Sequence, residues 1–239
     1  LMAGIAPLTF FRNFEQAFQQ NINAEDYRRI KDYRRHYSIS DEVIYLNHGS
    51  IGTIPKSVQH AHAELLAACE TNPWFFMWSG EWEEPREAVR RKAAEFINVQ
   101  AETIALTHNT TEVFNVMAMG LPLGSGDEVL FTNLNHAGAS LPFEIHAKRK
   151  GYTVRKIQLP FRETARMNKQ ELIEAHLSNI SGKTRLLVLP HMDNMIGLRT
   201  PVKEISEAAR ERGVEWIAVD TAQTLGMMPL DIGLMDVDV

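Results

Sequence analysis

The residues best placed for chemistry lie near the end of the sequence, where an acidic side chain follows a short apolar run. Residues 216–219 are continuously apolar and follow Gly213, which is typical of a buried parallel strand after a helix. Asp220 comes next, at the strand end where open α/β sheets bind ligands, and Gln223 lies close behind it. There a carboxylate can pair with the ring nitrogen of pyridoxal phosphate, while Gln223 reaches its phenolic oxygen. An ordinary turn or N-cap Asp is the alternative.

A second group of polar residues marks the expected start of a helix. Residues 108–112 read His-Asn-Thr-Thr-Glu and directly follow an apolar run. Asn109 is the expected N-cap, with Glu112 closing back on it. The free N–H groups of the first turn and the hydroxyls of Thr110 and Thr111 suit a phosphate, through hydrogen bonds and the helix dipole. Plain helix capping explains the same residues and stays open as an alternative.

Two further strand ends carry a histidine and an amide. His136 follows an expected strand at 128–132, and its flat imidazole can lie over an aromatic cofactor. Asn194 follows an expected strand at 186–189 and can donate to a phenolic oxygen. The alternative for His136 is a surface histidine, and for Asn194 a turn-forming residue. The surface alternative also holds for His48, which lies in a glycine-rich turn. Four strand ends with such residues on one rim nevertheless favour a shared site.

The elements that must position these residues alternate regularly along the chain. Alternation of this kind predicts an α/β fold with a mostly parallel sheet covered by helices on both faces. Thr200 as N-cap and Pro201 at the first helical position mark one helix start. The expected strands are 44–46, 103–106, 128–132, 153–157, 186–189 and 216–219, and the expected helices are 55–70, 85–96, 111–119, 140–150, 169–177 and 201–212.

The chain is expected to comprise two regions. Residues 1–44 are predicted to be an N-terminal helical arm, with two short helices within 11–37, and residues 45–239 to be a cofactor-binding large domain. An aromatic-rich loop is expected at 74–82. Residues 235–239 alternate acidic and apolar side chains like the entry to another strand, so we expect a C-terminal part that this sequence does not contain.

Composition narrows the classes of partner. With 44% hydrophobic and 23% charged residues, the chain has an ordinary globular composition. A net charge of -5 argues against nucleic acid, and the single Cys69 excludes an internal disulfide and a CxxC metal site. No apolar stretch approaches the roughly 18 residues needed to span a bilayer. We expect a cytoplasmic protein without a metal site; export with a removed N-terminal signal stays open.

The order of these motifs resembles the class V branch of fold-type I pyridoxal phosphate enzymes, which includes cysteine desulfurases, C–S lyases and isopenicillin N epimerase. Residues 45–52 (Tyr-Leu-Asn-His-Gly-Ser-Ile-Gly) and 72–74 (Asn-Pro-Trp), followed by Arg86, are most similar to the isopenicillin N epimerase-like group. The resemblance runs from about Tyr45 to the last residue. It implies a three-layer fold-type I large domain truncated before the small C-terminal domain, and a homodimer.

The resemblance also implies roles for individual residues. Asp220 and His136 would be catalytic, and the Schiff-base lysine is expected beyond Val239, because no lysine follows Lys203. The cofactor contacts implied are Thr110 and Thr111 on the phosphate, His136 stacked on the ring, Asn194 and Gln223 at the ring's O3′, and Asp220 at the pyridinium nitrogen.

The function expected is therefore that of a class V aminotransferase-like enzyme: an epimerase, lyase or transferase using pyridoxal phosphate. It would act on a small amino-acid substrate through an external aldimine and an α-carbanion, most like isopenicillin N epimerase. A cysteine desulfurase or C–S lyase of the same branch is one alternative, and a lysine-free, non-catalytic scaffold is another. A nucleotide-binding domain would need a G-x-G-x-x-G or P-loop motif, and the sequence contains neither.

Overall fold

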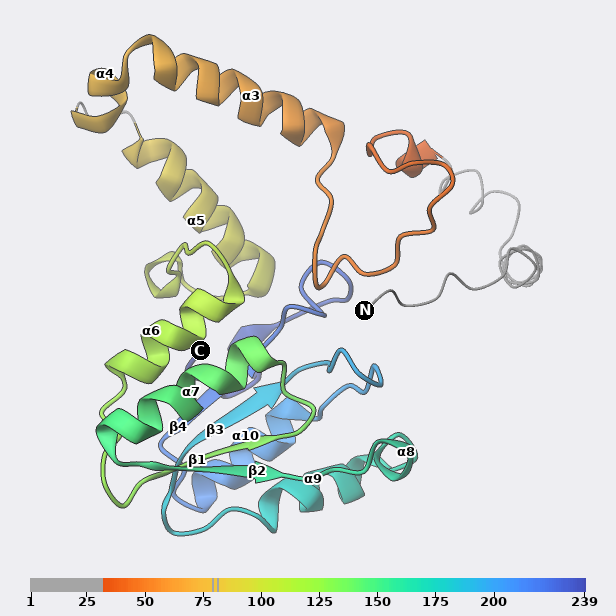
Figure 1. The fold of residues 1–239 in the computed structure, drawn as a ribbon, viewed down its shortest axis with the longest axis vertical. Helices are drawn as coiled ribbons and strands as arrows, with labels where there is room; N and C mark the ends of the chain where they lie inside the picture. Colours follow the sequence, from red (N-terminus) through yellow and green to blue (C-terminus); the bar gives the residue numbers. More distant parts are fainter. Residues whose placement is uncertain (1–31, 79, 81) are drawn as a thin grey trace. The chain divides into compact units, whose positions relative to one another are not determined.

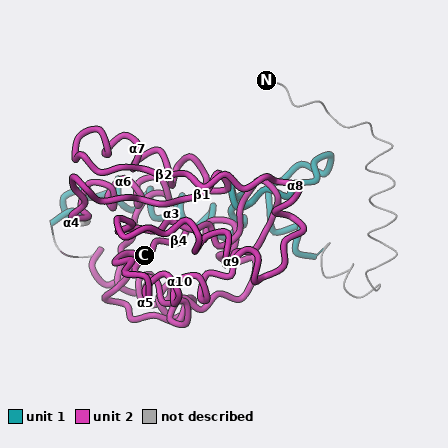
Figure 2. Tube along the Cα trace, turned by 90° about the horizontal axis from the view of Figure 1, so that it is seen from below, with its two compact units in different colours: residues 1–79 teal, residues 80–239 magenta. Residues whose placement is uncertain are grey.

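A computed structural model describes residues 32–78, 80 and 82–239 of the chain. These fall into two compact units, residues 1–79 and residues 80–239 (Figure 2). Each unit is described by itself below. The predicted domain boundary between residues 44 and 45 stays a prediction.

Within residues 38–78, unit 1 contains the helices α3 (Lys56–Thr71) and α4 (Pro73–Trp78) (Figure 1). The first confirms the helix predicted from Pro55 onwards, while the second replaces part of a predicted loop with a short helix. The predicted strand at 44–46 is wrong, because this extended segment pairs with no strand among the described residues and Leu46 is 73% exposed. Of the arm predicted at 11–37, only 32–37 are described, and 32–34 are helical.

Unit 2 is built on a four-stranded sheet in which every described pair of neighbouring strands is parallel. The order is β2-β1-β3-β4, so β1 and β3 are central. Leu187 lies opposite both Leu130 and Ile217, which aligns the apolar middle of the strands. The four strands match those predicted to within two residues: β1 (Glu128–Thr132), β2 (Thr153–Ile157), β3 (Thr184–Pro190) and β4 (Trp216–Asp220).

Helices cover both faces of this sheet, as Figure 2 shows in the view along it. The predicted helices of unit 2 are confirmed, although α8 and the two short 3-10 helices were not foreseen. The elements are α5 (Glu83–Ile97), η1 (Ala101–Thr103), α6 (Thr110–Gly120), α7 (Ala137–Lys150), α8 (Phe161–Thr164), α9 (Lys169–Leu177), α10 (Val202–Glu211) and η2 (Ile232–Leu234).

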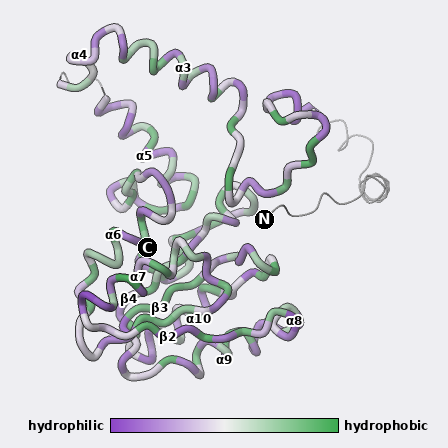
Figure 3. The backbone as a smooth tube through the Cα atoms, in the orientation of Figure 1, coloured by the Kyte–Doolittle hydropathy of each residue, from purple (hydrophilic) through white to green (hydrophobic). Residues whose placement is uncertain are grey.

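Alternate side chains of each strand point to two separate hydrophobic cores. Val129 and Phe131 pack with Phe114 of α6 and Phe143 of α7 on one face. Leu130, between them, belongs to the core on the other face with residues of α9 and α10. Burying a side chain of this size contributes about 1.5–3 kcal/mol. Hydrophobic residues accordingly mark the central strands in Figure 3. A sheet with a hydrophobic core and helices on each face confirms the three-layer α/β fold.

Two details of unit 2 differ from the prediction. Residues 103–106 form no strand, and Thr103 is the last residue of η1. The outer side of β4 is bonded by the last residues of the chain, with Val219 N–H donating to the Val239 carbonyl at 2.7 Å. Residues 235–239 are not assigned as a strand, so the expectation that they enter one stays a prediction. Helix α10 begins at Val202 with Pro201 as N-cap, one residue later than predicted with Thr200, because Thr200 uses its carbonyl to accept from Val202 N–H.

At the amino ends of the strands, Glu128 forms a buried polar cluster. Glu128 is 8% exposed, and its carboxylate accepts hydrogen bonds from Arg155 at 2.9 and 3.1 Å, Thr184 at 2.6 Å and Ser181 at 3.1 Å. Burial alone would raise the pKa of Glu128, but the Arg155 and Thr184 hydrogen bonds outweigh it and hold the pKa below its ordinary value. The cluster ties β1, β2 and the start of β3 together.

Replacing Glu128 with Gln is expected to lower the free energy of unfolding by about 1–3 kcal/mol near neutral pH, because it leaves Arg155 without its charged partner. A carboxyl whose pKa is lowered by folding stabilises the fold above its unfolded pKa of about 4.3 and loses that contribution as pH falls through the folded pKa. Urea unfolding of the parent and E128Q proteins should therefore converge at acid pH. An equal difference at neutral and acid pH would contradict the ion-pair assignment.

Among the described residues, no helix has both the length and the apolar character needed to cross a membrane. In the same part of the chain, no group of three or more potential metal ligands comes together.

Candidate active site

The carboxyl ends of β1, β3 and β4 lie side by side, because these strands are neighbours and parallel. His136 follows β1, Asn194 follows β3, and Asp220 ends β4. Helix α6 packs against α7, whose N-terminus carries His136. The sheet edge predicted to carry the site therefore does bring its residues to one side of unit 2.

The N-terminus of α6 presents an open first turn. Asn109 is the N-cap, as predicted, and its side chain accepts from Glu112 N–H at 2.9 Å. The prediction had the Glu112 carboxylate accept from the backbone N–H of Asn109. It accepts instead from the backbone N–H of His108, one residue earlier in the chain, at 2.8 Å. That backbone bond, with the His108 ring, lowers the pKa of Glu112. Thr110 and Thr111 are exposed in this turn, whose N–H groups have no partner within the helix.

Helix α7 begins beside this turn at His136. The ring Nδ1 of His136 accepts from Gly138 N–H at 3.1 Å, so the neutral imidazole carries its proton on Nε2. A Cβ at Gly138 would lie 2.5 Å from Thr111 Oγ1 and 3.1 Å from the His136 ring. Any larger residue at position 138 would force the Thr111 side chain to shift. The close approach of Thr111 to Gly138 brings Thr111 next to the turn that orients His136. In the sequence, the small residues that follow His136 are the one sign of this approach.

Asn135 holds the start of this loop. Its side-chain oxygen accepts from both the backbone and the hydroxyl of Thr132, at 2.9 and 3.0 Å, and its amide donates to the Val188 carbonyl at 3.2 Å. The end of β1 is thus bonded to β3 just before His136. No sequence motif assigns Asn135 this role.

If His136 stacks on the cofactor ring, as the resemblance implies, His136→Ala should weaken binding of pyridoxal phosphate and shift its absorbance in the intact protein. Aromatic pairs contribute about 0.5–1.5 kcal/mol beyond burial, so the loss of affinity should be roughly three- to tenfold. His136→Phe should recover most of the affinity but not the full turnover. Titration by absorbance checks this, and an alanine variant with unchanged affinity and spectrum would show that His136 is a surface residue.

The loop after β3 is organised by a buried acid that presents Asn194. Asp193 is 3% exposed, and its carboxylate accepts from the backbone N–H groups of Met195, Ile196 and Leu198 at 2.7–2.8 Å. Asn194 lies in the turn so formed and is exposed. No motif in the sequence predicts a role for Asp193, and its place directly before Asn194 is the one signal of it.

Asp220 is nearly buried, and one of its oxygens is still available. Its side chain accepts from Ala222 N–H through Oδ1 at 3.0 Å, whereas Oδ2 has no hydrogen bond to the described residues. Gln223 is half-buried and likewise makes no hydrogen bond within the part of the chain that is described. A carboxylate oxygen held at a strand end without a protein partner fits a cationic ring nitrogen, and the first turn of α6 fits a phosphate.

A cavity of about 700 Å³ lies elsewhere on the same edge. Its lining includes Met167 just before α9, His191 and Arg199 in the loop after β3, and Val202 at the start of α10. None of the six predicted cofactor residues lines it. The predicted residues, rather than the cavity, supply the donors and the carboxylate that a phosphorylated pyridine needs, so the predicted site stays the candidate.

The model of the family described as "Aminotransferase class-V" matches residues 44–239. The chain belongs to this family. Among similar class-V sequences is a probable cysteine desulfurase of Pyrococcus abyssi, 30% identical over 216 residues, covering 87% of this chain and 51% of the relative. The isopenicillin N epimerase of Amycolatopsis lactamdurans is 28% identical over 207 residues, covering 86% and 51%. The class-V chain thus spans about half the length of the curated relatives it matches.

Solved structures give the same picture of the class-V fold. A C-DES mutant with glycine covalently linked to its PLP cofactor superimposes with a TM-score of 0.75 at 26% identity, covering 85% of this chain and 53% of that one. An apo cysteine desulfurase of Thermococcus onnurineus NA1 superimposes with a TM-score of 0.69 at 23% identity, covering 87% and 51%, and supports the fold alone. The resemblance to the class V branch and the fold it implied are confirmed.

Proposed function

We propose that this chain is the cofactor-binding portion of an enzyme that uses pyridoxal phosphate to remove the α-proton of an amino acid. The observation that carries the proposal is the free Oδ2 of Asp220, on the same sheet edge as the open first turn of α6. Membership of the class-V family and the similarity to a structure with a PLP-linked glycine support it.

The residues have separate tasks in this proposal. When bound, the cofactor supplies an electron sink for the bond that breaks at the α-carbon. Asp220 holds a proton on the ring nitrogen by electrostatic pairing, and Thr110 and Thr111 bind the phosphate with the N-terminus of α6. His136 lies against the ring, and Asn194 and Gln223 donate to the phenolic oxygen.

Two outcomes of α-proton removal are candidates. Release of sulfur from cysteine or cystine is our first candidate, because the relatives include cysteine desulfurases and the C–S lyase C-DES, whose structure with cysteine persulfide is also similar. Epimerisation is the second, because the isopenicillin N epimerase of Amycolatopsis lactamdurans is 28% identical. Both begin with the same proton loss, so the residues above serve either.

The shared step is tested by incubating the intact protein and pyridoxal phosphate with single amino acids in D₂O. Deuterium at the α-carbon, followed by NMR, is the expected result for the true substrate class. Sulfide or persulfide released from cysteine or cystine then identifies the lyase, and inversion without sulfur release identifies the epimerase. Binding of pyridoxal phosphate without α-deuteration of any amino acid would refute the proposed chemistry.

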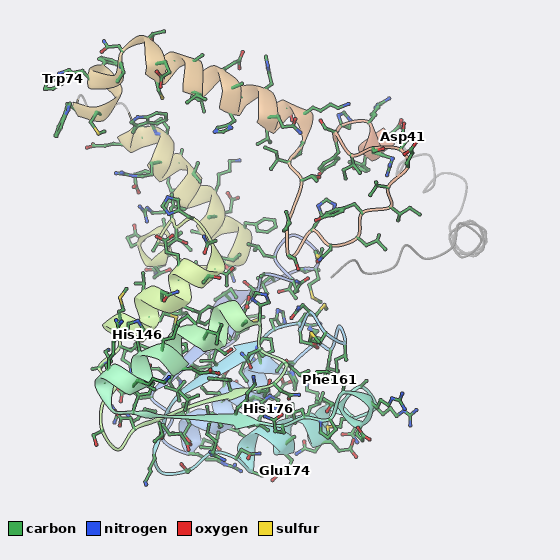
Figure 4. The ribbon with its side chains drawn as sticks, in the orientation of Figure 1. Asp41, Trp74, His146, Phe161, Glu174 and His176 are labelled. Atoms are coloured by element: carbon green, nitrogen blue, oxygen red, sulfur yellow. The ribbon has the colours of Figure 1, made fainter. Side chains whose placement is uncertain are left out.

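We also propose that the intact enzyme is a homodimer and that α4 contributes to its interface. Trp74, labelled in Figure 4, is on this helix and is 74% exposed, and Met77 and Trp78 on the same helix are 71% and 70% exposed. Aromatic residues and Met are enriched at interfaces, although an intrachain cover would also bury them. Light scattering should give a dimer at micromolar concentration, and a double Trp74→Ser, Trp78→Ser variant should shift it toward monomer. A monomeric parent would exclude the dimer.

A further inference from the structure

We propose that His191 is a positioning residue: it fastens the segment 220–225 in place and thereby aims Asp220 and Gln223 at the cofactor. The inference rests on the proposed function for the identity of the ligand. His191 directly follows β3 and is 1% exposed. It belongs to none of the cofactor contacts that the family resemblance implies.

The backbone of His191 completes the pairing of β3 with β4. Pro190 lies opposite Asp220 and has no N–H to donate. His191 N–H makes the last bond of the β3–β4 ladder, to the Asp220 carbonyl at 2.9 Å. The His191 carbonyl in turn accepts from Thr200 N–H at 2.9 Å, which ties the returning end of the β3 loop to the same point.

The imidazole makes the second attachment. Its Nδ1 lies 3.1 Å from Oγ1 of Thr224, a fully buried residue. Thr224 Oγ1 already donates its single proton to the Thr221 carbonyl at 3.1 Å, so it accepts from His191 Nδ1–H. Burial, together with the charge of Arg199, lowers the pKa of His191 and so favours the neutral ring.

The backbone bond to Asp220 and the side-chain bond to Thr224 lie on either side of Gln223. Between them the segment folds as a turn in which Ala222 N–H donates to Asp220 Oδ1, and Leu225 N–H donates to the Thr221 carbonyl at 2.9 Å. Gln223 lies inside that turn. One side chain therefore bridges the β3 loop to the far end of the turn, and the direction of the free Asp220 oxygen depends on it.

The chain offers a matched control in His176 (Figure 4). It is also buried, at 3% exposed, and burial lowers its pKa as well. Among the described residues, its Nδ1 bonds the Leu172 carbonyl of its own helix α9, at 2.7 Å, and no residue of another element. Removing His176 should therefore cost stability as removing His191 does, while the hydrogen bonds that hold the segment 220–225 stay intact.

The test uses the intact protein with Thr224→Val, which removes the hydroxyl at constant shape, and Thr224→Ser, which keeps it. His191→Leu and His191→Asn form the second pair, since the Asn amide can donate near the position of Nδ1. Without cofactor, amide exchange at Ala222 should accelerate about tenfold in T224V and H191L, because a buried hydrogen bond is lost. The dissociation constant for pyridoxal phosphate, by absorbance titration, should rise by a similar factor. T224S and H191N should stay near the parent in both.

His176→Leu should lower the melting temperature while leaving both readouts near the parent. If H191L and H176L change Ala222 exchange and cofactor affinity equally, His191 is merely a core residue and the inference is overturned. If the parent binds no pyridoxal phosphate, the proposed function fails, whereas the exchange measurement still decides whether His191 holds the segment.

Discussion

Replacing Asp220 with Asn is expected to lower turnover of the intact enzyme by on the order of a hundredfold or more, the usual effect of removing a group that stabilises developing charge. The substitution keeps the shape and leaves an oxygen to accept from Ala222 N–H at the position now held by Oδ1. It removes the negative charge that would keep the ring nitrogen protonated. Steady-state kinetics and the ¹⁵N shift of labelled pyridoxal phosphate measure the two consequences together.

Glu128→Gln is the control for this change. It also neutralises a nearly buried carboxylate of the same sheet, but at the amino ends of the strands. It should cost stability and leave the bound ring nitrogen protonated. Near-normal turnover of D220N, or an equal loss in both variants, would show that Asp220 does not pair with the cofactor.

Replacing Thr110 and Thr111 together with Val is expected to weaken binding of pyridoxal phosphate by at least tenfold. Hydrogen bonds to a charged group contribute about 1.5–3 kcal/mol each, and valine removes both hydroxyls while keeping the side-chain shape. The backbone N–H groups of α6 would remain, so binding should be weakened without being abolished. Absorbance titration of the intact protein gives the two dissociation constants.

Thr153→Val provides the comparison, because this exposed threonine lies at the amino end of β2 and its hydroxyl donates to the Asp127 carbonyl, far from the predicted site. It should leave the affinity unchanged. A double variant that binds pyridoxal phosphate as tightly as T153V would assign Thr110 and Thr111 to helix capping alone.

The sheet could be predicted from sequence because its strands lie between well-marked helices. The central β1 and β3 are buried runs bounded by charged or polar residues, and the helices between them carry caps and apolar faces. The failures at 44–46 and 103–106 share one cause. A short apolar run becomes a strand only if another strand pairs with it, and that choice depends on distant parts of the chain.

The candidate site was predictable only in outline. Placing polar residues after parallel strands is enough to gather His136, Asn194 and Asp220 on one edge. The approach of Thr111 to Gly138, and the bond from His191 to Thr224, join residues from different loops. No local pattern encodes such pairs, so the residues that hold the site were found only in three dimensions.

A crystal structure of the intact protein with pyridoxal phosphate would test the proposed site most directly. We expect the phosphate at the first turn of α6, within hydrogen-bond distance of Thr110 and Thr111, and the ring nitrogen paired with Oδ2 of Asp220. A cofactor lodged in the cavity beside His191 and Arg199, or a ring nitrogen turned away from Asp220, would contradict the proposal.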